Sequence, residues 1–204
     1  MSGHLVLLGD SIFDNAIYVP DGPAVIDHVR RLAPSDWRAT LVAQDGDVVD
    51  DVFGQVERVP QDATHLVISI GGNNALQATE VLSRPATNVG TAVDDLTEIR
   101  RDFQRGYRAM LWRVLSLDLP LAVCTIYDAV PGLSSQMQTA LCIFNDTITR
   151  EAMAMQVPVI DIRHLCHEAA DYSEISPIEP SAQGGGKIAR AIAGLLGWMP
   201  QPAH

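Results

Sequence analysis

The chain of 204 residues is long enough for a substantial core, and we expect residues 1–204 to form a single domain. Its apolar share of 47% and charged share of 19% are typical of a compact soluble protein. The formal net charge of -11 argues against nucleic acid and anionic membrane surfaces, because both bind basic proteins.

Five short apolar runs, each bounded by Gly, Asp, Asn or Pro, predict buried strands at residues 5–9, 39–43, 65–71, 121–127 and 157–162. Helical periodicity lies between and after them, at 24–33, 91–118, 137–155 and 185–198. The longest helix should bury one stripe, made of Leu96, Ile99, Phe103, Met110, Val114 and Leu117. Alternation of strands and helices predicts a parallel sheet with helices on both faces.

Cys124, Cys142 and Cys166 are well separated and form no C-x-x-C pair. A disulfide framework or zinc ribbon is therefore not expected, and we predict that Cys124 and Cys142 are buried thiols. The segment before Asp10 is too short and too uncharged for a signal peptide, and no run approaches the length of a membrane span. We expect a cytoplasmic protein.

Functional side chains of a parallel sheet collect where its strands end. The first strand ends in "GDSIFDN", which exposes Ser11 at that edge as a possible nucleophile, although a Ser or Asp there also caps helices. The second strand leads to Gly46, which fits an ordinary turn equally well. The third ends in "IGGNNAL", where the Asn73 amide could donate a hydrogen bond to an oxyanion.

Taken together, these strand ends resemble the SGNH hydrolases, the GDSL-type esterases and lipases. The resemblance spans essentially the whole chain and implies a three-layer α/β/α sandwich with a five-stranded parallel sheet of the flavodoxin-like kind. "GDSI" would place the nucleophile on Ser11, "DGD" would place a backbone donor on Gly46, and "GGNN" would place a side-chain donor on Asn73. Asn74 stands where the family usually has Asp.

The fourth block of the family, D-x-x-H-P-S, is altered in this chain. The same frame reads "SPIEPSAQGGGKIA", with Ser176 in the Asp position and Glu179 in the His position. A buried carboxylate can accept and return a proton if its pKa rises toward neutrality, and it needs no partner to fix a tautomer. The paired loss of Asp and His is therefore coherent.

Three interpretations of this block are open. Ser11 and Glu179 could form a dyad, or a histidine after the fifth strand, His164 or His167, could act as the base. In the third, the base is lost and the domain only binds a ligand. The sequence favours a serine esterase that hydrolyses a small acyl or acetyl ester, with Ser11, Gly46, Asn73 and Glu179 as its site. No cofactor or metal is expected, and the sequence does not define an oligomeric state.

Overall fold

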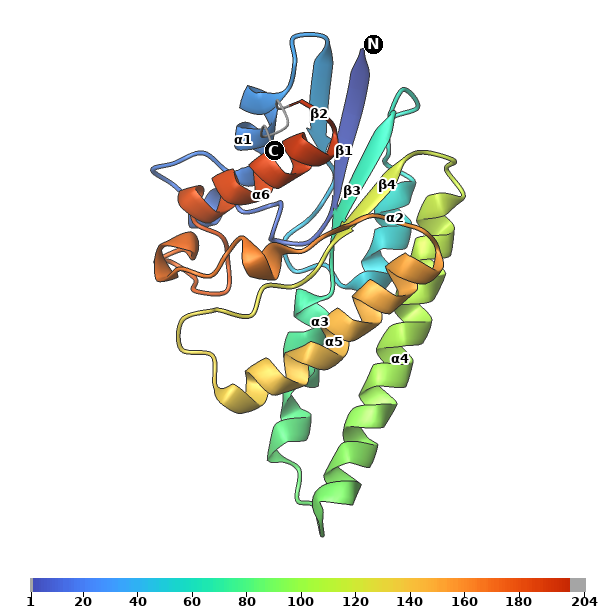
Figure 1. Cartoon of the computed structure of the whole chain (residues 1–204), viewed down its shortest axis with the longest axis vertical. Coiled ribbons are helices and arrows are strands. Elements are labelled where there is room, and N and C mark those ends of the chain that lie inside the picture. The colour runs from blue at the N-terminus through green and yellow to red at the C-terminus, as the bar shows by residue number, and fades with distance from the viewer. Residues whose placement is uncertain (1, 199–204) are drawn as a thin grey trace, which may run out of the picture.

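A five-stranded parallel sheet forms the middle layer of the computed structural model, which describes residues 2–198 (Figure 1). Its strands are β1 (Gly3–Gly9), β2 (Trp37–Leu41), β3 (His65–Ser69), β4 (Leu121–Cys124) and β5 (Val159–Ile160). They lie in the order β2-β1-β3-β4-β5, and all four pairings are parallel. The predicted sheet is confirmed, and its strand order is that of flavodoxin-like folds.

Helices cover both faces of the sheet, as predicted. The helices are α1 (Val25–Leu32), α2 (Val52–Val56), α3 (Gly72–Gln77), α4 (Val89–Leu115), α5 (Ser135–Ala154) and α6 (Ala182–Leu195). Short 3-10 turns are η1 (Ala16–Tyr18), η2 (Val49–Asp51), η3 (Ala78–Ser83), η4 (Ile162–His164) and η5 (Ala169–Asp171). Alternation along β1 sends Leu5 and Leu7 into the core under α1 and α6, and Val6 and Leu8 into the core under α2, α4 and α5.

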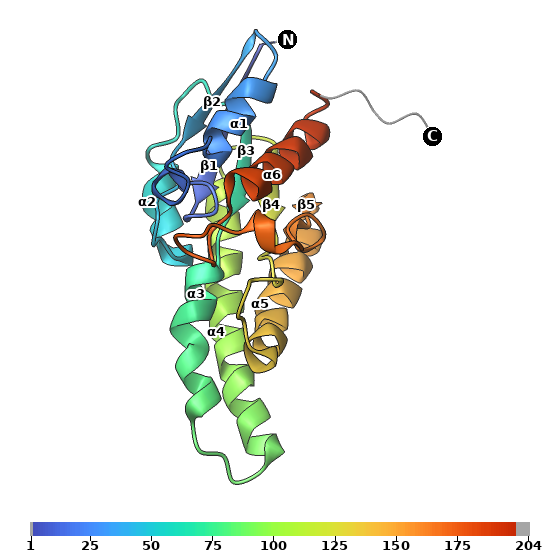
Figure 2. The same ribbon diagram turned by 90° about the vertical axis from the view of Figure 1, so that its left-hand side faces the viewer.

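One part of the molecule extends beyond the sheet. Helix α3 with η3, the N-terminal half of α4 and the N-terminal half of α5 run past the edge where the strands end (Figures 1 and 2). The predicted apolar stripe of α4 therefore changes its neighbours along the helix. Phe103, Met110 and Val114 are buried in the core, whereas Leu96 and Ile99 are only partly buried and line a groove.

Three expectations need correction. Helices α2 and α3 were not predicted, because segments of five and six residues are too short to show helical periodicity. The last strand is only two residues long, so most of the predicted 157–162 run is irregular. Cys124 is buried as predicted, but Cys142 is exposed, because it lies on the outer side of α5.

Within residues 2–198, no helix is long and apolar enough to cross a membrane.

Candidate active site

Ser11 lies in a tight turn directly after β1. Gly9 has φ +125°, and a Cβ there would lie 1.8 Å from the carbonyl oxygen of Ser69, so only glycine permits this approach of β1 to β3. The N–H of Asp10 donates to that same oxygen at 3.0 Å, and the Asp10 carboxyl accepts from the N–H of Ile12 at 3.1 Å. These bonds fix the backbone on both sides of Ser11, whose side chain is nearly buried.

Asn73 lies in the first turn of α3, which begins just after β3. Its Nδ2 donates to the carbonyl oxygen of Asp47 at 2.9 Å, and its side chain lines the same groove as Ser11. Asn74 points elsewhere, since its Oδ1 accepts from the N–H of Val49 at 3.1 Å. Gly46 precedes Asp47, has φ +86° and is exposed. Asn73 and the Gly46 loop are thus brought together, but Gly46 does not line the groove.

Glu179 is buried at the same end of the groove, with 4% of its surface exposed. Its own backbone is held on both sides. The N–H of Glu179 donates to the carbonyl oxygen of Ser176 at 2.9 Å, and its carbonyl oxygen accepts from the N–H of Ser173 at 2.8 Å. This short turn explains why the segment "SPIEPS" can place a carboxylate at a fixed point without belonging to a helix or strand.

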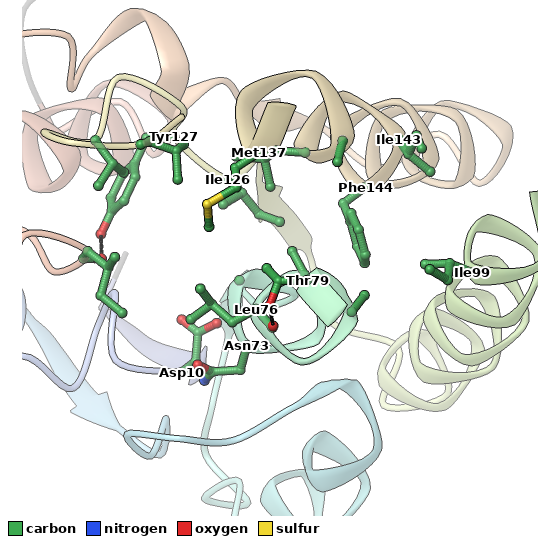
Figure 3. Close-up of a pocket in the computed structure, with 18 of the residues that line it drawn as sticks. Asp10, Asn73, Leu76, Thr79, Ile99, Ile126, Tyr127, Met137, Ile143 and Phe144 are labelled. Carbon is green, nitrogen blue, oxygen red and sulfur yellow. Dashed lines mark hydrogen bonds between the residues drawn. The ribbon is translucent and has the colours of Figure 1, made fainter. Parts of the chain in front are cut away.

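Two buried side chains tie the Glu179 segment to the rest of the site. The Tyr127 hydroxyl, three residues after the end of β4, donates to the carbonyl oxygen of Ile178 at 2.6 Å (Figure 3). Asn15, four residues after Ser11, donates from Nδ2 to the carbonyl oxygen of Pro180 at 3.0 Å. The residues on either side of Glu179 are therefore anchored by the segment after β4 and by the loop that carries Ser11.

The glycines of "GGGK" have a packing role. Ser181 caps α6, because its Oγ accepts from the N–H groups of Gln183 and Gly184 at 3.1 and 3.2 Å. At Gly184, a Cβ would lie 2.2 Å from the carbonyl oxygen of Asp171, so the first turn of α6 can approach η5 only with glycine. Lys187 then forms an ion pair with the buried Asp171 at 2.8 Å. These contacts hold the start of α6, which follows the Glu179 segment, against η5.

Two carboxyl groups at this site are strongly perturbed. Burial raises the pKa of Glu179 to about 8; hydrogen bonding by the Ser11 side chain opposes this shift, and the charges of Asp10 and Asp45 increase it. Burial also raises the pKa of Asp10 to about 7, against hydrogen bonds from neighbouring backbone N–H groups. Glu179 Oε2 is buried and has no hydrogen-bond partner among the described residues. Ser11 thus lies beside a carboxyl group with raised basicity.

The two candidate histidines lie outside this site. The His164 side chain is 84% exposed, with Nε2 lying 3.6 Å from the Asp161 carboxylate. His167 is also exposed, and neither residue lines the groove. Across residues 2–198, no group of three or more His, Cys, Asp or Glu side chains is arranged to hold a metal ion.

From this polar end a groove continues between α3 and α5. In Figure 3, Leu76 and Thr79 of α3 and η3 face Met137 and Phe144 of α5, and Ile99 of α4 lies beyond them.

Three residues of the site carried no predicted role: Asp10, Asn15 and Tyr127. Asp10 and Asn15 belong to "GDSIFDN" and Tyr127 ends the fourth predicted strand, so the rule that sites form at strand ends could have identified all three.

Comparison with solved structures supports the fold. The chain superimposes on a lipase from a goat rumen metagenome with TM-score 0.74 and 18% identity, covering 95% of this chain and 97% of that one. A variant of an acetyl xylan esterase from Geobacillus stearothermophilus gives TM-score 0.72 and 14% identity, covering 100% and 99%. An extracellular lipase from Streptomyces rimosus gives TM-score 0.67 and 18% identity, covering 95% and 99%.

At these identities the likeness establishes a shared α/β fold over nearly the whole length of both chains. Two further structures of the Geobacillus esterase are catalytic mutants, in which a serine or a histidine is replaced by alanine. Compared with protein-family models and with curated proteins, the chain matches none.

Proposed function

We propose that the protein hydrolyses carboxylic esters, with Ser11 as nucleophile and Glu179 as general base. One observation carries the proposal: the buried side chains of Ser11 and Glu179 lie together at the polar end of the groove. Burial raises the pKa of the Glu179 carboxyl group to about 8, a shift that the Ser11 side chain opposes. An ordinary carboxylate is too weak a base to activate a hydroxyl group. A buried carboxylate beside a buried serine, at the polar end of a groove, has the basicity that this step requires.

The reaction needs no other acid or base. The Glu179 carboxylate takes the proton from Ser11 Oγ while Oγ bonds to the ester carbonyl carbon. When the tetrahedral intermediate collapses, the C–O bond to the alcohol breaks and protonated Glu179 returns that proton to the leaving oxygen. Water then attacks the acyl-serine, and Glu179 takes and returns a proton in the same way, which releases the carboxylic acid and restores Ser11.

The oxyanion of each tetrahedral intermediate needs fixed hydrogen-bond donors. One N–H of the Asn73 amide is engaged by Asp47, and the second is available to the substrate oxygen. The backbone N–H of Ser11 is proposed as a second donor, whereas Gly46, which does not line the groove, is not given this role. The bond from Asn73 to the Asp47 carbonyl keeps the glycine loop beside Asn73, so one side chain serves both as donor and as support.

The solved structures of similar fold support this proposal. They include lipases and an acetyl xylan esterase, and the catalytic mutants of that esterase replace a serine and a histidine. In this chain the serine of the resembled family is retained, while a glutamate stands at the histidine position. We therefore propose a change of base with the nucleophile kept.

The test compares purified wild-type protein with four variants on p-nitrophenyl butyrate at alkaline pH. Ser11→Ala and Glu179→Gln should reduce turnover to background, and a fluorophosphonate should label wild type but not Ser11→Ala. Glu174→Gln, an exposed carboxylate on the same loop, and His164→Ala should retain activity. Activity in Glu179→Gln with loss in His164→Ala would overturn the dyad. Turnover in wild type no higher than in Ser11→Ala, across a broad ester panel, would favour a ligand-binding domain.

A further inference from the structure

The groove that begins at Ser11 is polar at one end and mostly apolar elsewhere. Asp10, Ser11, Asn73 and Glu179 lie together at the sheet edge. The groove wall beyond them is formed by residues within 75–82 of α3 and η3, 96–99 of α4, 126–133 after β4, and 137–144 of α5. Leu82, Leu141 and Phe144 are typical of this part. A ligand that fits both ends needs a reactive polar head and a long apolar tail.

The two side-chain hydroxyl groups along the apolar part of the groove donate their hydrogens to carbonyl groups of the protein. The Thr79 hydroxyl donates to the carbonyl oxygen of Leu76 at 2.7 Å, within its own helical turn. The Tyr127 hydroxyl donates to Ile178. A sugar with several hydroxyl groups, or a charged group, that entered this part would lose hydration and find few side-chain partners beyond these two hydroxyl oxygens, and each group left unpaired has a desolvation cost. The groove therefore selects against acetylated sugars beyond its mouth and for hydrocarbon.

Apolar side chains in the groove wall remain partly exposed. Leu76 is 38% exposed and Leu82 is 40% exposed, and both line the groove. Each methylene group that an aliphatic chain buries against such a surface stabilises the complex by about 0.8 kcal/mol. The wall from Gly72 to Leu82 rises roughly 15–20 Å along its axis, which accommodates a chain of about ten carbons or more.

We propose that this groove binds the acyl chain of a medium- or long-chain carboxylic ester, an inference that rests on the proposed function. The sequence led us to expect a small acyl or acetyl ester, and the aliphatic length of the groove points to a longer acyl group. The alcohol leaves on the side of Glu179, which donates its proton, next to Ile178, 37% exposed at the groove mouth. The acyl chain, which stays on Ser11 after the alcohol has left, lies behind Asn73 among the three helices.

The first experiment measures kcat/KM for p-nitrophenyl esters with acetyl, butyryl, octanoyl, dodecanoyl and hexadecanoyl chains. Wild type should gain at least about 100-fold from butyryl to dodecanoyl, since each methylene contributes. Ala140→Trp, which fills the groove from α5, should abolish that gain, so that kcat/KM no longer rises from butyryl to dodecanoyl. Ala154→Trp, an exposed position at the end of the same helix, is the matched control and should behave as wild type. If Ala140→Trp does not fold, as judged by thermal unfolding, Ala78→Phe blocks the groove from the opposite wall.

The second experiment separates the groove from the chemistry. Ser11→Ala should bind dodecanoate by titration calorimetry, and Ser11→Ala with Ala140→Trp should not. Binding with this pattern in a protein that hydrolyses no ester would keep the groove and overturn the proposed function. Ser11-dependent hydrolysis with a flat chain-length profile and no dodecanoate binding would overturn the groove and keep the function. Hydrolysis of dodecyl acetate in preference to methyl dodecanoate would assign the groove to the alcohol and overturn the acyl assignment.

Discussion

Asn15 and Pro180 are joined by a buried hydrogen bond, from Nδ2 of Asn15 to the carbonyl oxygen of Pro180 at 3.0 Å. The same amide accepts from the N–H of Val25 through Oδ1 at 2.9 Å. Asn15 is fully buried, and it connects the loop of Ser11, the start of α1 and the segment of Glu179. The separation between the proposed nucleophile and base therefore depends on a residue that touches neither reacting group.

Asn15→Ala should both destabilise the fold and reduce activity. It leaves the Val25 N–H and the Pro180 carbonyl without partners, each at a cost of about 1–3 kcal/mol in the free energy of unfolding. Chemical denaturation should show this loss with an unchanged m-value. At temperatures where the variant stays folded, kcat should fall more than KM rises, because the base is displaced while the groove is intact. Full activity in a destabilised Asn15→Ala would show that the bond serves the fold alone.

Tyr127→Phe isolates the positioning of Glu179 from simple packing. The change removes the bond to the Ile178 carbonyl and retains the buried ring, so kcat should fall about tenfold with little change in KM. Tyr172→Phe is a close control, because its hydroxyl donates to the Cys166 carbonyl at 2.8 Å and its ring packs edge-on against Tyr127. Both variants should lose about 1 kcal/mol of stability. Equal kcat in the two variants would contradict a positioning role for Tyr127.

How much of this site the sequence predicts depends on how local each signal is. Ser11 and Asn73 were predictable because they follow β1 and β3, whose ends meet where the strand order reverses. Glu179 was predictable from the frame of the fourth block. The Tyr127 bond to Ile178 spans 51 residues, and nothing in either local pattern indicates it.

The groove was equally hidden. The periodicity of Leu96 and Ile99 is the same as that of Phe103 and Val114, and a helical stripe does not state which neighbour it meets. Only the extension of α3, α4 and α5 beyond the sheet decides that the first pair faces a groove and the second pair the core. The segment "GGNNAL" carries too little periodicity in six residues to predict α3.

Asn73→Ala should lower kcat by about 10²–10³ with little change in KM, because the oxyanion bond strengthens in the transition state. Asn74→Ala removes the acceptor for the Val49 N–H and should lower the free energy of unfolding by about 1 kcal/mol with less than about a fivefold effect on kcat. Steady-state kinetics on one ester measures both. Equal kcat losses at the two positions would mean that the donor is misassigned.

The pH dependence of kcat/KM should report the unusual base. Ionised Glu179 is required, so activity should rise with pH along a limb near 8, the raised pKa of this carboxyl group. The negative charge of Asp10 contributes to the raised pKa of Glu179. Asp10→Asn should therefore lower that pKa and move the limb to lower pH. A histidine base would place it near about 6.5. A limb that stays in place in Asp10→Asn, or one near the ordinary range of carboxylic acids, would contradict this electrostatic picture.

Glu179→Gln should reveal a stability cost of the proposed base. In the unfolded chain the carboxyl group releases its proton near 4.5, whereas burial holds it in the folded protein up to about pH 8. The stability that the protonated group confers is thus fully present below pH 4.5 and is lost as pH rises through 8. Glutamine does not titrate and escapes this loss.

Relative to wild type, Glu179→Gln should therefore gain stability as the pH rises, by about 1–3 kcal/mol in the free energy of unfolding at about pH 9. Each kcal/mol corresponds to about 2–4 °C in Tm for a chain of this size. Differential scanning calorimetry between about pH 5 and pH 9 measures the difference. Glu174→Gln, exposed on the same loop, should show no such trend. An inactive Glu179→Gln that becomes more stable than wild type at alkaline pH would show that the buried carboxylate required for catalysis also lowers the stability of the folded protein. A difference that is constant with pH, or largest in acid, would mean that Glu179 is not held protonated by burial.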